Sequence, residues 1–285
     1  MTILGIGQSV FDILYPIREF ETNKKYRVKD SVQCVGGPVT CAMVLCAKWK
    51  AQTRICSRVG QDGFGKEIIE QLKAYSIDTT YIFMDPNDHT SISSIFIDSR
   101  GNRTIFNHPM TFESIYPYEV DESCDVVLFD GHEIDLSLKV FHKLQNTITI
   151  FDGDKLKKES MELIKNVDYL ICSLEFAQEI TNHAFNQNTY KELCQINQNH
   201  VVLTMGEKGC VFEDRIYPAY PCKVKDTTGA GDIFHGAFAY GLDQKWPIDQ
   251  VISYASMASA ICCEKIGGIP SLPSLEEVKK RLKPM

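Results

Sequence analysis

The stretch around which the chain is organised reads Val224-Lys-Asp-Thr-Thr-Gly-Ala-Gly-Asp-Ile-Phe-His-Gly-Ala-Phe238. Two glycines, Gly229 and Gly231, stand just before an apolar run, so the pattern predicts a flexible turn that opens into a helix. The first amides of a helix have no partner within the helix, and the helix dipole adds positive potential there. We therefore expect this turn to bind an anion such as a phosphate, with glycine letting the backbone come close to it.

Asp232 follows these glycines and has two interpretations. In isolation, an Asp in the first turn of a helix is a favourable partner for the dipole and needs no chemical role. Beside an anion-binding turn, the same carboxylate can take a proton from a substrate hydroxyl while backbone amides stabilise a transferring phosphoryl group. The rest of the chain has to decide between them.

The composition is typical of a globular protein, with 44% hydrophobic and 24% charged residues in a chain of 285. A net charge of −7 disfavours a nucleic-acid partner, which needs a clustered basic surface. No segment approaches the ~20 apolar residues of a membrane span, so no membrane partner is expected. The eleven cysteines contain no C-x-x-C pair, which favours reduced thiols and a cytoplasmic location.

The second half of the chain alternates short apolar runs with helical stretches. The runs are 126–130, 147–152, 169–173 and 201–206. This pattern predicts the buried strands of a mostly parallel sheet joined by crossover helices, hence an α/β fold in a single domain over residues 1–285. The runs end in polar residues, which are expected at one edge of the sheet: Asp130, Asp152, Ser173 and Thr204.

Earlier in the chain the sequence pattern is different. Residues 91–108 alternate partially around a Gly-Asn turn and predict a β-hairpin without a helix. Together with a short exposed strand expected within 26–35, they indicate a small sheet beside the main domain. We expect its strands within about 11–35 and 90–108.

The N-terminal Gly5-Ile-Gly7 resembles the start of a dinucleotide-binding turn, but Val10 stands where its third glycine is required. We therefore reject a dinucleotide site. Gly36-Gly37-Pro38 opens a second predicted helix, because proline suits the first helical position. Glycines at a helix start again offer backbone donors to a ligand.

In this order, the motifs resemble the ribokinase-like (PfkB) family of carbohydrate kinases over nearly the whole chain. The most specific of them is Asp226-Thr-Thr-Gly-Ala-Gly-Asp232. The other stretches that carry the resemblance are Gly5-Ile-Gly7 with Asp12, Gly36-Gly37, Arg58 to Gly65, the hairpin through Arg103, Thr204-Met-Gly206, and Ala258 through Gly268 to Pro273.

The resemblance implies a three-layer α/β/α sandwich with a central, mostly parallel sheet and a small β-sheet lid. It also implies transfer of the γ-phosphoryl group of ATP to a sugar hydroxyl. Asp232 matches the catalytic base of the family, and Gly229, Ala230 and Gly231 match its anion hole. Aligning the two substrates and stabilising charge are what phosphoryl transfer chiefly asks of a protein.

Further roles follow from the resemblance alone. Asp12, Gly36 and Gly37 match positions that bind sugar hydroxyls. The positions expected on the nucleotide side are Thr204, Gly206, Lys208, Gly209, Thr227, Ala258 and Gly268. Glu175 is expected to act on Mg²⁺, with Asp152 as a second candidate. The positions at which many members hold a monovalent cation, commonly K⁺, are Asp226, Thr228, Gly268 and Ser271.

Departures from the family pattern affect the expected substrate. Cys41 stands where many members have Asn, which argues against a plain ribokinase or adenosine kinase. Cys172 replaces the Asn that precedes Glu175 in the family motif. The lid stretch Arg103 to Asn107 resembles the branch that acts on hexoses and on acidic or derivatised sugars. Arg103 and Asn107 are thus candidate substrate ligands, and Arg103 can pair with a carboxylate, sulfonate or phosphate. The alternative for Arg103 is a solvated hairpin arginine.

The prediction is thus an ATP-dependent carbohydrate kinase that uses Mg²⁺ and K⁺ and forms a homodimer through its lid. Two alternatives stay open. One is a nucleoside kinase of the same fold, and the other is a non-catalytic sugar or nucleotide sensor, since a fold does not dictate a function.

Overall fold

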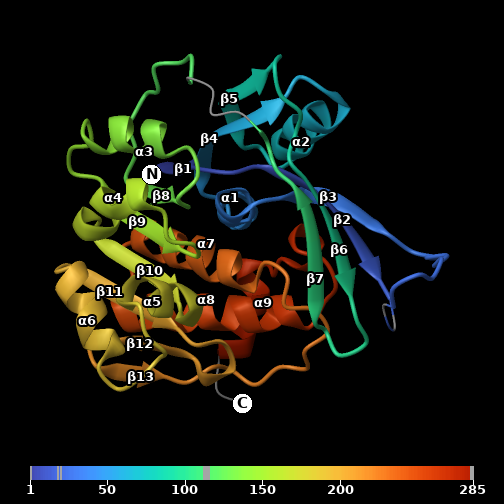
Figure 1. Cartoon of the computed structure of the whole chain (residues 1–285). Coiled ribbons are helices and arrows are strands. Elements are labelled where there is room, and N and C mark those ends of the chain that lie inside the picture. The colour runs from blue at the N-terminus through green and yellow to red at the C-terminus, as the bar shows by residue number, and fades with distance from the viewer. Residues whose placement is uncertain (1, 18, 20, 112–115, 283–285) are drawn as a thin grey trace.

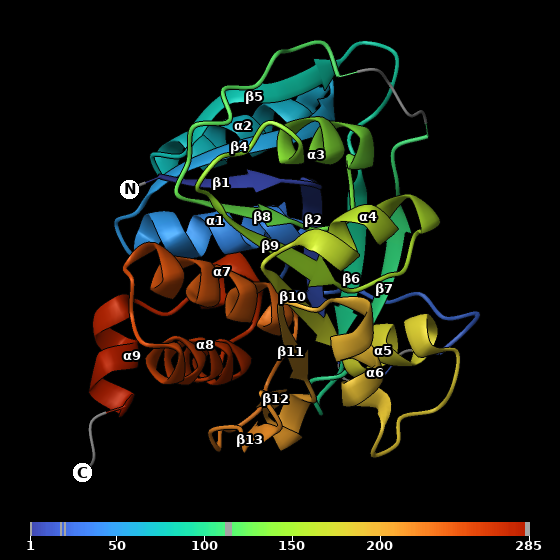
Figure 2. The same cartoon turned by 90° about the vertical axis from the view of Figure 1, so that its left-hand side faces the viewer.

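The computed structural model describes residues 2–17, 19, 21–111 and 116–282. Its main body is built on a nine-stranded sheet in the order β13-β12-β11-β10-β9-β8-β1-β4-β5, seen edge-on in Figure 2. All neighbouring strands from β11 to β5 pair in parallel, and β12 and β13 add an antiparallel edge. The strands are β1 (Thr2–Ile6), β4 (Gln52–Gly60), β5 (Asp78–Asp85), β8 (Val126–Phe129), β9 (Ile148–Gly153), β10 (Tyr169–Ser173), β11 (His200–Thr204), β12 (Cys210–Phe212) and β13 (Arg215–Tyr217).

Helices cover both faces of this sheet. One face carries α1 (Pro38–Lys48), α2 (Gly63–Ala74), α7 (Ala230–Asp243) and α8 (Ile248–Cys263), with α9 (Leu275–Leu282) outside them. The other carries α3 (Ile134–Phe141), α4 (Met161–Asn166), α5 (Leu174–Thr181) and α6 (Thr189–Ile196). Successive residues of a strand point to opposite faces, so Val126 and Leu128 enter the first core while Val127 and Phe129 enter the second. The predicted three-layer sandwich is confirmed.

A separate four-stranded sheet stands off the main body, at the right of Figure 1. Its order is β3-β2-β6-β7, with β2 (Val10–Pro16), β3 (Val32–Gly36), β6 (Ile92–Ile97) and β7 (Arg103–His108). We call it the lid. Leu14, Cys34, Ile95 and Ile97 form its own small core, and Gly267 of the main body packs within reach of Leu14. The inner face of the lid is therefore the one that carries these residues.

The lid strands cover 10–16, 32–36, 92–97 and 103–108, beside expected ranges of about 11–35 and 90–108, and the strand expected within 26–35 begins only at Val32. The described residues of 21–31 are exposed and rich in charge, from Glu21 to Asp30. Charged side chains are rarely buried, so a strand made of them would have no apolar face to pack against the core of the lid. The strand therefore begins where the apolar alternation begins, at Val32.

Candidate active site

The glycine turn before α7 forms an open helix N-terminus, as the sequence predicts. Gly229 is the N-cap residue with a φ of 76°, a left-handed conformation that favours glycine. Ala230 donates to the carbonyl of Thr227 at 3.2 Å, and Ile233 donates to that of Gly229 at 2.9 Å. Among the described residues, the amides of Gly231 and Asp232 donate to no backbone carbonyl outside the helix. These amides are available to an anion.

Asp232 lies in the first turn of α7 and is partly buried. Loss of hydration raises the pKa of its carboxyl to about 6, with Arg103 opposing this rise and Asp154 and Asp130 adding to it. A carboxyl with this pKa is ionised at neutral pH yet basic enough to accept a proton. The position and environment fit a general base.

Asp12 lies on the inner face of the lid, in β2. Burial raises the pKa of its carboxyl to about 7, while a hydrogen bond with Ser93 opposes the rise and the charge of Asp232 adds to it. Gly36 lies so close that a Cβ there would overlap the Asp12 carboxylate. Gly37 has a φ of 101° and no room for a Cβ beside the carbonyl of Gln8. The two glycines thus let the lid strand and the start of α1 meet at Asp12.

Asp130 holds together the loops that follow β1 and β8. Its carboxylate accepts hydrogen bonds from the amides of Gln8 at 2.9 Å and His132 at 2.9 Å. A Cβ at Gly7 would overlap it. The sequence placed Asp130 at a strand end but assigned it no role, because nothing local marks a contact across 122 residues.

A buried pair lies one turn beyond Asp232. The Nδ1 atom of His235 is 3.3 Å from Oδ2 of Asp152. Burial lowers the pKa of His235 to about 4 and raises that of Asp152 well above its usual range.

The residues expected on the nucleotide side differ in their exposure to solvent. Gly206 to Lys208 form an exposed 3₁₀ turn after β11, Gly209 packs against the carbonyl of Tyr217, and Thr204 donates to the carbonyl of Cys172 at 3.1 Å. Ala258 has no exposed surface and belongs to the main core. Contact between Ala258 and adenine would require the surrounding side chains to move.

The four positions expected at a monovalent cation come together below the glycine turn. The Asp226 carboxylate accepts hydrogen bonds from the amides of Thr228 at 2.8 Å and Gly267 at 2.9 Å. Ser271 donates to the carbonyl of Gly268 at 2.6 Å. Asp226 and Ser271 are 1% exposed. Such a set of buried oxygens fits a hard cation.

Glu175 is exposed in the first turn of α5, at the carboxyl end of β10. In the described part of the chain, no three His, Cys, Asp or Glu side chains are grouped closely enough to bind a metal by themselves.

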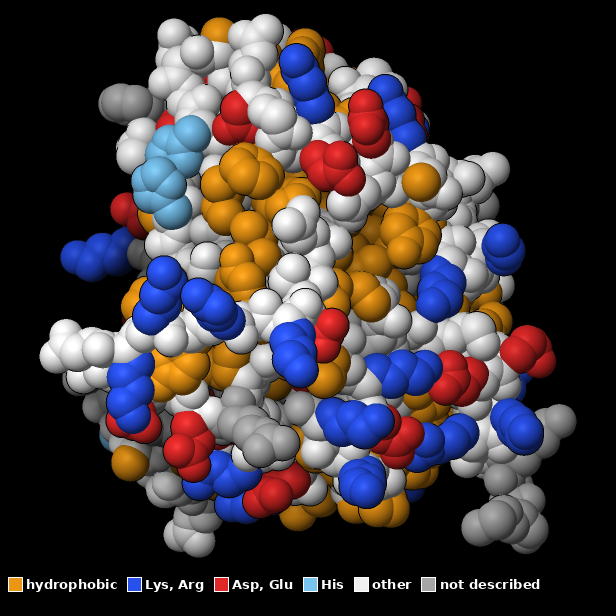
Figure 3. All heavy atoms as spheres, turned by 90° about the vertical axis from the view of Figure 1, so that its right-hand side faces the viewer, with side chains coloured by type: hydrophobic (Ala, Val, Ile, Leu, Met, Phe, Trp, Pro, Cys, Tyr) orange, Lys and Arg blue, Asp and Glu red, His pale blue; other side chains and the backbone are white. Residues whose placement is uncertain are grey.

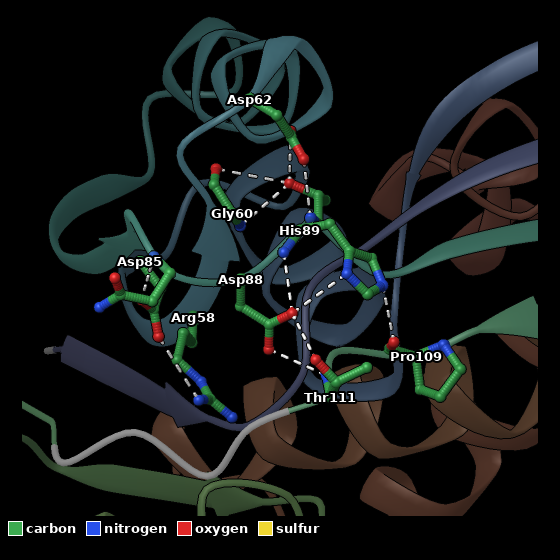
Figure 4. A network of polar contacts seen from close by, with 10 residues as sticks. Arg58, Gly60, Asp62, Asp85, Asp88, His89, Pro109 and Thr111 are labelled. Atoms are coloured by element: carbon green, nitrogen blue, oxygen red, sulfur yellow. Dashed lines mark hydrogen bonds and ion pairs between the residues drawn. The ribbon is translucent and has the colours of Figure 1, made fainter.

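The root of the lid is fastened by polar contacts between its two connections to the main body (Figure 4). Asp88, before β6, accepts hydrogen bonds from the amide and hydroxyl of Thr111, after β7, at 2.9 and 3.0 Å. The Nε2 atom of His89 lies 2.8 Å from the carbonyl oxygen of Pro109. Asp62, the N-cap of α2, accepts from the amide of Thr90 at 2.8 Å. These contacts therefore join the two connections of the lid to each other and to the start of α2.

The two candidate substrate ligands of the lid lie at opposite ends of β7. Asn107 donates to the hydroxyls of Ser91 and Ser93, both at 3.1 Å, and so joins the Asp12 end. Arg103 instead donates from Nη1 to the carbonyl of Thr227 at 2.8 Å. Ser93, which the sequence analysis missed, links Asn107 to Asp12, and only the strand register reveals it.

The described chain contains no helix that is both long and apolar enough to cross a membrane. Comparison with known proteins then adds to the geometry. The model of the pfkB family of carbohydrate kinases matches residues 3–275. A ribokinase of Lactococcus lactis is 31% identical over 237 residues, covering 79% of this chain and 77% of the relative.

Solved structures give the same fold. The chain matches Arabidopsis thaliana ribokinase complexed with ribose and ATP with a TM-score of 0.85 at 21% identity, covering 99% of both chains. It matches a nucleoside kinase of Methanocaldococcus jannaschii with a TM-score of 0.80 at 20% identity, covering 99% of this chain and 97% of the other. With its glycine turn, its lid and a family match over nearly its full length, the chain belongs to the pfkB family of carbohydrate kinases.

Proposed function

We propose that the protein transfers the γ-phosphoryl group of ATP to a sugar hydroxyl, with Asp232 as the general base. The observation that carries this is that the Asp232 carboxylate lies in the first turn of α7, where the amides of Gly231 and Asp232 donate to no backbone carbonyl outside the helix. The hydroxyl proton passes to Asp232, the hydroxyl oxygen bonds to the γ-phosphorus, and ADP leaves with the electron pair of the broken bond. The amides at Gly231 and Asp232 stabilise the negative charge that develops.

The sugar is proposed to lie between Asp12 and Asp232, with Gly36 and Gly37 leaving room for it. Asn107 and Ser93 hold the Asp12 end. Cys41 lies near both carboxylates, since after burial their charges are the main causes that raise the pKa of its thiol. Ribose is the first sugar to test, because similar proteins bear the name ribokinase.

The nucleotide is proposed to lie over the turn Gly206 to Gly209, with its terminal phosphate at the α7 N-terminus. The other nucleotide-side positions stay predictions: Thr204, Lys208, Thr227, Ala258 and Gly268. Mg²⁺, when bound, would neutralise charge on the phosphates, and Glu175 would hold its water ligands. Asp226, Thr228, Gly268 and Ser271 are the residues that would hold K⁺.

The test is ADP formation measured by chromatography against a panel of pentoses, hexoses, sugar acids, sugar phosphates and nucleosides. We expect turnover with at least one sugar and loss of turnover in Asp232→Asn, which keeps its affinity for a nucleotide. Near wild-type turnover in Asp232→Asn would falsify the assignment of the base. Preference for a nucleoside would favour the second candidate, suggested by the nucleoside kinase of the same fold. Binding without any product would favour a sensor.

We also propose that two copies pair through the outer faces of their lids. Tyr15 stacks on Phe96 there, and Phe96 meets Phe106, which is 55% exposed. Figure 3 views the molecule from the lid side and shows apolar side chains gathered between charged ones, with histidines at their border. Exposed aromatic clusters of this kind mark contact surfaces. Sedimentation should give a dimer for the wild type and a monomer for Phe106→Glu.

A further inference from the structure

Arg103 and Asp12 lie at opposite ends of the lid strands. The register pairs Asp12 with Ser93 and Ser93 with Asn107, whereas Arg103 pairs with Ile97 at the other end of the strand. Arg103 and Asn107 lie on the same face, four positions apart. At about 3.4 Å per residue this separates them by about 13 Å along the lid.

The tip of the lid hairpin rests on the segment that leads into α7. Gly101 has a φ of 82°, and a Cβ there would lie 2.9 Å from the carbonyl oxygen of Lys225. Lys225 is itself anchored, because its amide donates to the carbonyl of Cys263 in α8 at 2.8 Å. A glycine at the tip thus permits direct contact between the lid and the segment before the glycine turn.

This contact places the Arg103 guanidinium at the phosphate-binding turn. Nη1 donates to the carbonyl of Thr227 at 2.8 Å, and the same oxygen accepts from the amide of Ala230 at 3.2 Å. A guanidinium has five N–H groups, and contacts among the described residues use one of them. The exposed remainder can donate to phosphate oxygens bound at the α7 N-terminus.

Several negatively charged side chains surround Asp232, and a cation beside it offsets their charge. Carboxylates approach it from several elements: Asp12 on β2, Asp130 after β8, Asp152 in β9 and Asp154 after it. Their charge disfavours both an ionised base and an incoming triphosphate. Arg103 opposes them, as its effect on the pKa of Asp232 indicates.

We propose that Arg103 is a catalytic residue that acts on the transferring phosphoryl group, supplied by the lid when its tip rests on the α7 turn, and not a ligand of the sugar. The inference rests on the proposed kinase function and replaces the substrate role expected from the sequence. Lid closure then brings the guanidinium to the phosphates, and an open lid withdraws it. Because the guanidinium reaches the phosphates only when the lid is closed, water hydrolyses little ATP while no sugar holds the lid closed.

The experiment compares Arg103→Met and Arg103→Lys with Arg100→Met, a matched control. Arg100 lies in the same hairpin, but its side chain is 83% exposed and pairs with Asp98 of the turn. Wild-type turnover on a sugar, lost in Asp232→Asn, is established first, so failure of the proposed function is recognised before any Arg103 variant is interpreted. Thermal melting and nucleotide binding confirm that each variant is folded.

For Arg103→Met we expect kcat to fall by about 1,000-fold or more, from the lower end of the range of effects of arginines that act on phosphoryl groups. The KM for the sugar should stay within about threefold of wild type, since an interaction made only in the transition state changes kcat and not binding. The acidic limb of the kcat profile should move to higher pH, because the charge that favours ionised Asp232 is lost. Arg103→Lys should restore part of the limb position, and Arg100→Met should change nothing.

Gly101→Ala gives a second route to the same result. A methyl group at this left-handed position should lift the hairpin tip from Lys225, lowering kcat in the same direction while Arg103 remains. The proposal is overturned if Arg103→Met raises the sugar KM and leaves both kcat and the pH profile unchanged. That outcome would return Arg103 to sugar recognition.

Discussion

Asp12 on the lid and Asp232 on α7 lie close enough for one carboxylate to affect the ionisation of the other. Burial is the larger cause of the raised pKa of Asp12, and the negative charge of Asp232 adds to it. The two residues are 220 positions apart in the sequence, and they come from the two separate sheets and their helices. A substrate hydroxyl between them would meet one group that accepts its proton and another that orients the sugar.

The pH dependence of the reaction should reflect these carboxyls. Asp232 accepts a proton only when ionised, and its pKa is raised to about 6. Activity should therefore be lost as pH falls through about 6, instead of near the value of about 4 that is usual for Asp. The measurement is kcat/KM for the preferred sugar between pH 5 and 9. Activity that stays constant down to pH 5 would contradict the raised pKa.

Asp12→Asn should raise the stability of the protein at pH 8 and weaken its binding of the sugar. A carboxyl whose pKa is higher in the folded state favours folding at low pH, and this contribution is lost as pH rises from about 4 to 7. At pH 8 the buried charge therefore opposes folding, and Asn removes it. We expect the Tm to rise by a few degrees at pH 8, for a gain on the order of 1 kcal/mol, while the sugar KM rises at least about tenfold. An equal change in Tm at pH 4 would show that the charge is not the cause.

Gly36→Ala should weaken sugar binding through Asp12. The added Cβ overlaps the Asp12 carboxylate, so this side chain must leave its position. We expect the sugar KM to rise by roughly tenfold or more, with ATP binding unchanged, since a misplaced binding group costs on the order of 1–3 kcal/mol. Gly63→Ala is the matched control, because its Cβ would meet no atom within 4 Å. Similar KM values for the two variants would argue that Asp12 does not bind the sugar.

Asp226→Asn should loosen the turn before α7 and remove activation by K⁺. Asn offers one acceptor oxygen where the carboxylate serves both Thr228 and Gly267. Losing a charge-assisted hydrogen bond at a buried site costs about 1–3 kcal/mol, so the Tm should fall. The assay compares activity across a K⁺ titration at constant ionic strength. If wild-type activity is independent of K⁺, Asp226 acts only as a structural link.

Local patterns in the sequence determined much of this protein. The helix that starts at Ala230 follows from glycines before an apolar run, and the parallel sheet follows from apolar runs alternating with helices. The lid hairpin follows from alternation around a Gly-Asn turn. Each depends on neighbouring residues alone, because backbone conformation and burial of one face are decided within a few positions.

The tertiary structure decided which distant side chains meet. Strand register places Ser93 and Asn107 beside Asp12, and docking of the lid tip brings Arg103 to Thr227, 124 residues away in the sequence. Ala258, expected at the nucleotide, is enclosed in the core by the packing of α8 on α7. A one-residue shift of register would reverse the faces of the lid, and no local pattern specifies how a hairpin tip rests on another segment. The glycine turn was thus predictable from the sequence, whereas the contact between Arg103 and this turn appears only in the fold.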